Sequence, residues 1–214
     1  MSFLRSTLSW LMLATGWSGG DVPGDPFAMA DESAPPLAIV SAVSRRIHPA
    51  TTPVVGDIDL LGPDNIEPRL GGPTQLVVGF DGDVHATSGG EVTCANVMLS
   101  SGMCLSVTGS GTPTLTIAMH GTPRNQCVQV SLMNIPGLPH TDEPDFTVRP
   151  ILGDVNLDGV VNLIDLHLVK KHWFQGGPNP LVEFLSDVNV DGVINIVDLG
   201  DLPANMFGYL WECP

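Results

Sequence analysis

Oxygen-bearing side chains recur at fixed intervals in two twelve-residue segments, Asp154–Asp165 and Asp187–Asp198. Both segments carry Asp, Asn, Asp, Gly, Asn and Asp at positions 1, 3, 5, 6, 9 and 12. Oxygens at alternate positions, with Gly for a sharp turn at position 6, let a chain wrap a hard cation, and calcium takes about six to eight oxygen ligands. The two segments therefore predict two calcium sites.

The same loop template assigns the ligands of both ions. Positions 1, 3, 5, 9 and 12 supply side-chain oxygens, and position 7 supplies its backbone carbonyl. The alternative is a pair of Asp/Asn-Gly turns that bind nothing. The expected ligands are Asp154, Asn156, Asp158, Val160, Asn162 and Asp165 in the first segment, and Asp187, Asn189, Asp191, Val193, Asn195 and Asp198 in the second.

The charge of the chain supports cation binding and argues against nucleic acid. The net charge is −15, which would repel phosphates. Residues 150–214 hold nine acidic residues against only Lys170 and Lys171. Such a tail repels itself until cations neutralise it, so we expect the metal-free tail to be loosely folded.

The N-terminus predicts a leader over residues 1–30. A positive start, the apolar stretch Leu8–Ala14 and the small-residue pattern Ala28-Met29-Ala30 are typical of a secretory signal, and the alternative is a disordered leader. External calcium is millimolar, which favours a secreted or cell-surface protein. The sequence contains no apolar run of about 18 residues, so we expect no membrane span.

Residues 37–149 are expected to form an all-β domain. Short runs rich in Val, Thr, Ile and Leu alternate with Gly- and Pro-containing turns, a pattern that favours an immunoglobulin-like sandwich. Phe146–Arg149 is a further strand candidate, and the prolines of residues 136–150 predict a stiff hinge. The strand candidates are Leu37–Val43, Val54–Leu60, Gln75–Phe80, Glu91–Leu99, Cys104–Thr108, Thr114–Met119 and Cys127–Leu132.

A helix is expected after each calcium segment, which makes residues 150–210 a separate small α domain. Leucine, valine and tryptophan recur at three- and four-residue steps from Leu163 to Trp173. The second helix begins near Ile196 but meets Pro203, so it is expected to be shorter than the first or to restart beyond this proline.

Four cysteines leave two interpretations open. Cys94 and Cys104 flank an apparent hairpin and could be bridged outside the cell, whereas buried free thiols would fit an intracellular chain. Their spacing, with that of Cys127 and Cys213, fits no zinc site and does not specify the pairing.

The paired loops, each leading into a helix, resemble the type I dockerin module over residues 150–210. Pro150 leaves no room for the helix that precedes an ordinary EF-hand loop, and position 12 is Asp (Asp165 and Asp198) where an EF-hand usually has Glu. The resemblance implies docking onto a cohesin module, in assemblies that degrade polysaccharides.

The resemblance also implies which residues contact the partner, namely positions 10 and 11 of each loop and a basic pair further along. Pro203 and Ala204 replace the basic pair in the second copy, so the first helix is expected to carry the contact. The alternatives are packing between the two halves for the apolar residues and a solvated face for the lysines. The implied residues are Leu163, Ile164, Lys170, Lys171, Ile196 and Val197.

The upstream region resembles, less sharply, a β-sandwich found ahead of dockerins in secreted bacterial proteins. The resemblance rests on Val43–His48, Gly56–Gly62 and Leu70–Gly72, and it supplies no catalytic residue. The first functional hypothesis is therefore a secreted, non-catalytic protein that docks through its calcium-folded tail.

Two further hypotheses stay open. One is a hydrolase or carbohydrate-binding accessory of polysaccharide breakdown, and the other is a pair of calcium loops that merely staples the C-terminus. Hydrolysis needs two carboxyl groups about 5 to 10 Å apart, which acidic residues at strand ends could supply. No Trp stands between residues 18 and 172 to stack on a sugar, which argues against both sugar functions. The carboxyl candidates are Asp57, Asp59, Asp81, Asp83 and Glu91.

Overall fold

The computed structural model describes residues 36–49, 54–62, 65–120, 126–139, 143–175, 184–203 and 206. The predicted leader (residues 1–30), Ala204 and Cys213 lie outside these residues. The described residues all belong to one compact unit. Among the described helices, none is long and apolar enough to cross a membrane.

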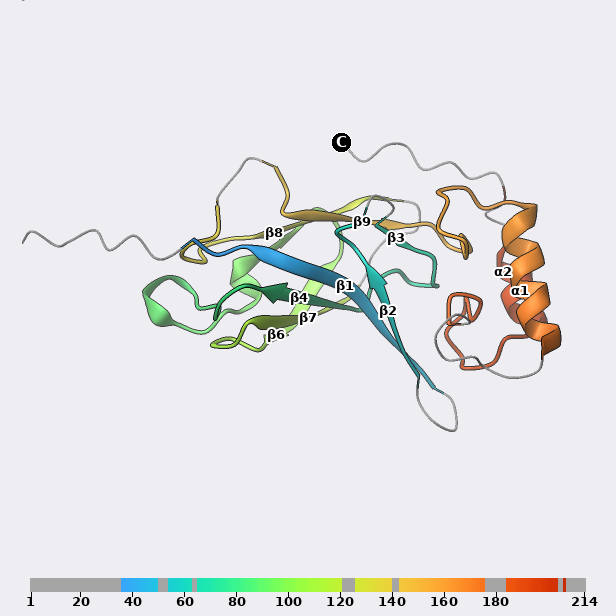
Figure 1. The fold of residues 1–214 in the computed structure, drawn as a ribbon, viewed down its shortest axis with the longest axis horizontal. Coiled ribbons are helices and arrows are strands. Elements are labelled where there is room, and N and C mark those ends of the chain that lie inside the picture. The colour runs from blue at the N-terminus through green and yellow to red at the C-terminus, as the bar shows by residue number, and fades with distance from the viewer. Residues whose placement is uncertain are drawn as a thin grey trace, which may run out of the picture. The chain divides into compact units, whose positions relative to one another are not determined.

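The β-rich region, residues 37–150, contains two sheets within the described part of the chain (Figure 1). Neighbouring strands pair antiparallel, except that β3 and β9 pair parallel. One sheet has the order β2 (Val54–Asp59), β1 (Ile39–His48), β4 (Gln75–Phe80), β7 (Thr114–His120) and β6 (Met103–Thr108). The other has the order β3 (Ile66–Glu67), β9 (Phe146–Pro150), β8 (Val128–Leu132) and β5 (Val97–Leu99).

Both sheets contribute to a single apolar core. Strands β4, β7, β8 and β9 bury every second residue, as a half-buried strand should. Leu76 and Ile117 of the first sheet and Val130 and Val148 of the second belong to one buried cluster. The predicted β-rich region is therefore present, and its assignment as an immunoglobulin-like sandwich remains a prediction.

The structure corrects several predicted strand boundaries. Glu91–Leu99 is not one strand, because Thr93 caps a 3₁₀ turn over Cys94–Asn96 and only Val97–Leu99 pairs with β8. Strand β1 runs on to His48, well beyond the predicted end, and β3 was missed because two residues show no periodicity.

The predicted hinge at residues 136–150 is wrong for its described residues. Leu138 is buried in the core. The strand candidate Phe146–Arg149 is confirmed, because Phe146–Pro150 is a strand paired with both β8 and β3. The strand contains only the last of the four prolines, Pro150, so their spacing did not define a hinge through this segment.

The interpretation of Cys94 and Cys104 as a bridge is confirmed. Their sulfur atoms form a disulfide that joins the turn before β5 to strand β6, and so links the two sheets. Cys127 is also disulfide-bonded.

Replacing both Cys94 and Cys104 with serine is expected to destabilise the fold by about 3 kcal/mol, because the bridge closes a short loop that lowers the entropy of the unfolded chain. Chemical denaturation of the double variant and the parent, both oxidised, measures the effect. A reducing agent is the wrong test, since it would also reach the disulfide of Cys127. An unchanged unfolding midpoint would contradict the expectation.

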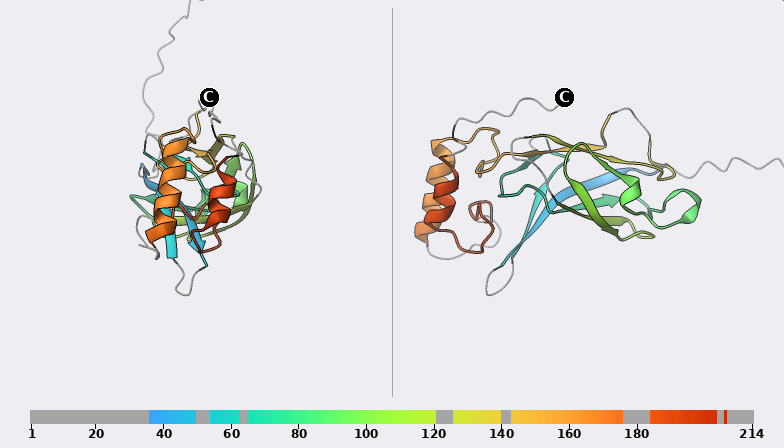
Figure 2. Two further views of the ribbon diagram at one scale, coloured as in Figure 1. Left: turned by 90° about the vertical axis from the view of Figure 1, so that its right-hand side faces the viewer. Right: turned by 180° about the vertical axis from the view of Figure 1, so that it is seen from behind.

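A second, smaller core lies in the loop-helix region, residues 151–202. Helix α1 (Leu163–Gln175) contributes Val169, and the chain just beyond α2 (Ile196–Asp201) contributes Leu202. The two helices lie side by side in the left view of Figure 2 and contact each other. Helix α2 ends before Pro203, so the expected inequality of the two helices is confirmed. Ile66 of β3 is buried in this same cluster.

Candidate metal loops

The first residue of each loop holds the turn that follows it. Asp154 accepts hydrogen bonds from the backbone N–H groups of Asp158 (3.1 Å) and Gly159 (2.7 Å). Asp187 accepts the equivalent pair from Asp191 (3.1 Å) and Gly192 (2.9 Å). The two copies therefore share their internal contacts as well as their residue types.

The last residue of each loop closes it and starts the helix. Asp165 accepts from the backbone N–H of Asn162 at 2.8 Å and Asp198 from that of Asn195 at 2.8 Å. The side-chain oxygen of Asn195 in turn accepts from Val197, which completes a capping box at the start of α2. The predicted ligands at positions 9 and 12 thus also fix where the helices begin.

The fourth residue of each loop has a left-handed backbone. Leu157 has φ 59° and Val190 has φ 60°, and Gly159 and Gly192 at position 6 both have φ 88°. A positive φ is uncommon for leucine and a marked outlier for β-branched valine. Its recurrence at one position in both loops shows that the loop path imposes it, a constraint that sequence reasoning identified only at the glycines.

Carboxylates are buried in both loops, which is costly without a positive partner. Asp154, Asp165, Asp187 and Asp198 are all buried. Burial raises the pKa of Asp154 to about 6, backbone hydrogen bonds oppose the shift, and the charges of Asp165 and Asp158 add to it. Burial likewise raises the pKa of Asp198, with contributions from the charges of Asp187 and Asp191.

This concentration of like charge fits a bound cation. Among the described residues no three His, Cys, Asp or Glu side chains converge closely enough to hold a metal ion by themselves. A calcium loop does not require that, because asparagine oxygens and a backbone carbonyl complete its ligand set. The predicted ligands are brought together within each loop, and their identity as calcium ligands remains a prediction.

Comparison with known families decides the nature of this region. The model of the dockerin type I domain matches residues 152–202. These residues form a type I dockerin module. The match begins just before Asp154 and ends at Leu202, so it includes both loops and both helices. Neither a curated protein nor a solved structure matches the chain.

The residues implied in partner contact lie on the surface of the dockerin module. Leu163 (65 % exposed), Ile164 (55 %), Ile196 (61 %) and Val197 (54 %) occupy the first turns of α1 and α2. All four side chains are thus more than half exposed, and their role in partner contact remains a prediction. Lys170 and Lys171 are exposed on α1.

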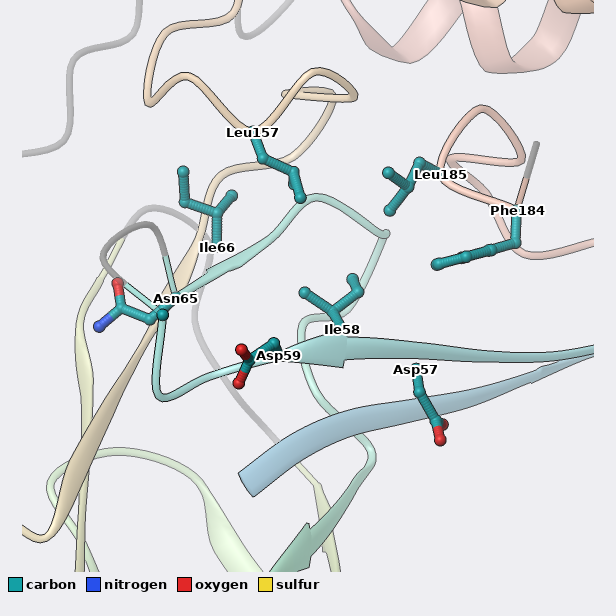
Figure 3. A pocket seen from close by; sticks show the side chains of 9 residues that line it. Asp57, Ile58, Asp59, Asn65, Ile66, Leu157, Phe184 and Leu185 are labelled. Carbon is teal, nitrogen blue, oxygen red and sulfur yellow. The ribbon is translucent and has the colours of Figure 1, made fainter. Parts of the chain in front are cut away.

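A pocket of about 310 Å³ lies where the dockerin module meets the β-rich region (Figure 3). Ile58, Ile66, Leu157, Phe184 and Leu185 form its apolar lining, with Asp57 and Asp59 at one side. Asp57 is already engaged by Arg45 at 2.6 Å, and Asp59 accepts from the backbone of Leu61. The two carboxylates therefore have structural partners of their own.

Sequence reasoning missed two groups of the β-rich region that lie against or beside the dockerin module. Glu67 and Arg69 form a buried ion pair, and His48 contacts Asp187. The sequence Glu67-Pro68-Arg69 places the two opposite charges close together, which was a weak local indication of the ion pair. His48 gave none, because its partner is 139 residues away.

Proposed function

We propose that this chain is a secreted, non-catalytic protein whose dockerin module binds two calcium ions and docks onto a cohesin-type partner. Type I dockerin domains in general bind calcium and dock onto cohesins, and residues 152–202 match that family. Each loop would hold one ion through the residues at positions 1, 3, 5, 7, 9 and 12. The ions would neutralise the buried carboxylates and so fix the helices that carry the docking residues.

Exposed apolar side chains carry the docking part of the proposal. Leucine, isoleucine and valine at four positions are more than half exposed at the starts of α1 and α2. Each helix start thus presents two adjacent exposed apolar side chains, Leu163 with Ile164 and Ile196 with Val197, which a partner could cover. Lys170 and Lys171 on α1 would add positive charge at the margin of the docking surface. In the second copy, Pro203 stands at the position that corresponds to Lys170.

Replacing Leu163 and Ile164 together with aspartate is expected to weaken binding to a cohesin by at least about 30-fold, the effect of losing a central apolar contact. The equivalent change at Ile196 and Val197 is expected to weaken it less. Calorimetric titration of each variant with a cohesin, in excess calcium, measures both effects.

A control with the same chemistry separates docking from general surface effects. Leu105 lies on the edge strand β6 and is 57 % exposed, so Leu105→Asp adds a charge at an equally exposed apolar site. It should leave binding unchanged. If the second pair proves as important as the first, the two halves bind equally, and the expected dominance of α1 is wrong.

The β-rich region is proposed to be an immunoglobulin-like sandwich that the dockerin module anchors. Secretion is supported by the disulfide between Cys94 and Cys104, since disulfides persist in oxidising compartments. The hydrolase or carbohydrate-binding alternative is tested by incubating the whole protein with a panel of polysaccharides. Retention on a polysaccharide or release of sugar would favour that alternative. The absence of both would support the non-catalytic proposal.

A further inference from the structure

One side chain of the β-rich region reaches a predicted calcium ligand. His48 is the last residue of β1, and its side chain is only 4 % exposed. Its Nδ1 lies 2.6 Å from Oδ2 of Asp187, the residue at position 1 of the second loop. This distance is that of a short hydrogen bond between the β-rich region and the loop.

The proton of this hydrogen bond belongs to the histidine. A ligating carboxylate is ionised and can only accept, so Nδ1 must donate. Nε2 of His48 is buried and has no hydrogen-bond partner among the described residues.

Neighbouring contacts keep His48 and the second loop together. The backbone N–H of Leu70 donates to the carbonyl of Val188 at 2.8 Å. The Phe184 ring stands edge-on to His48 at 6.1 Å and lies 5.7 Å from the guanidinium of Arg69. A Cβ atom at Gly56 would come within 2.5 Å of Phe184, so only glycine leaves room for this ring.

The first loop has no equivalent support within the described residues. Asp154 accepts from Asp158 and Gly159 of its own loop, and no side chain of the β-rich region there donates to it. Asp187 has the same two backbone donors and His48 in addition. The two loops therefore have the same internal hydrogen bonds at position 1, and only the second has an additional contact, from His48 to Asp187.

We propose that His48 is a positioning residue for the second calcium loop. By holding the Asp187 carboxylate in one orientation, it raises the calcium affinity of this loop and leaves that of the first loop unchanged. The inference rests on the calcium binding proposed above. Partners that orient a metal ligand are typically worth about 10- to 100-fold in affinity. Binding is reciprocal, so calcium in the second loop also strengthens its contact with the β-rich region.

The test isolates each loop in the full-length protein. Asp158 and Asp191 are the exposed position-5 residues, so Asp158→Ala leaves the second site and Asp191→Ala leaves the first. Calorimetric titration with calcium then gives one affinity per background. His48→Phe keeps an aromatic ring without the donor, and His48→Asn places an amide N–H near the position of Nδ1.

We expect His48→Phe to weaken calcium binding about 10- to 100-fold in the Asp158→Ala background and not in the Asp191→Ala background. His48→Asn should recover most of the affinity. Three results would overturn the inference: no effect of His48→Phe, equal losses with phenylalanine and asparagine, or equal losses at both sites. If the unaltered protein takes up no calcium, the proposed calcium function itself fails, which is a separate and distinguishable result.

Discussion

Replacing Glu67 with glutamine is expected to cost about 3 to 5 kcal/mol of folding free energy, because it leaves the charge of Arg69 buried without its partner. Both side chains are completely buried. Arg69 donates from Nε to Oε1 of Glu67 (2.6 Å) and from Nη2 to Oε2 (2.7 Å), which is the strong two-pronged geometry. Chemical denaturation at constant calcium measures the loss.

The pair also connects separate parts of the chain. Arg69 donates from Nη1 to the carbonyl of Gly56 in β2 at 2.8 Å and from Nη2 to that of Ser44 in β1 at 3.2 Å. Ser44 donates its hydroxyl to Glu67. A single unpaired charge at this point would therefore weaken the attachment of β3 to the larger sheet.

Two controls make the Glu67 prediction specific. Changing Glu67 to leucine and Arg69 to methionine together removes both charges, and should cost clearly less than the two single changes added together. The ion pair of Arg45 and Asp57 has a similar length but is about one-third exposed, so Asp57→Asn should cost less than about 1 kcal/mol. Equal losses for Glu67→Gln and Asp57→Asn would show that burial does not decide the strength of these pairs.

Removal of calcium is expected to unfold the dockerin module. Each site filled at a calcium concentration about 1,000-fold above its dissociation constant stabilises the fold by about 4 kcal/mol, and chelation removes that contribution. The four buried carboxylates would then repel one another without compensation. Circular dichroism should show the loss of the signal from α1 and α2, which are the α-helices among the described residues.

Fluorescence follows the same transition through tryptophan emission. Trp173 lies in α1 and the β-rich region contains no tryptophan, so replacing Trp10, Trp17 and Trp211 with phenylalanine makes Trp173 the local probe. A protein with Asp158 and Asp191 both changed to alanine should show the chelated spectrum even in calcium. Identical melting curves with calcium and with chelator would contradict the expectation.

Sequence patterns correctly predicted those strands and helices whose apolar periodicity is contained in a short segment of the chain. The strand at Gln75–Phe80 and the start of α1 at Leu163 are found at their predicted boundaries, because strand alternation and helical spacing act over a few residues. Strand β3 and the contact of Asp187 with His48 were not predicted, because a two-residue strand and a contact to β1 depend on the tertiary fold. The hinge prediction failed for a related reason, since the burial of Leu138 in the core also depends on the tertiary fold.

The parallel pairing of β3 with β9 extends beyond the sheet, because Ile151 donates to Glu67 at 3.1 Å and Gly153 donates to Pro68 at 2.8 Å. The chain is thus still hydrogen-bonded to the β-rich region one residue before Asp154 opens the first loop. The dockerin module is therefore attached rigidly to the β-rich region and not through a flexible linker. A partner that grips α1 would set the direction in which the β-rich region points, and a pull on the module would load this short ladder in shear.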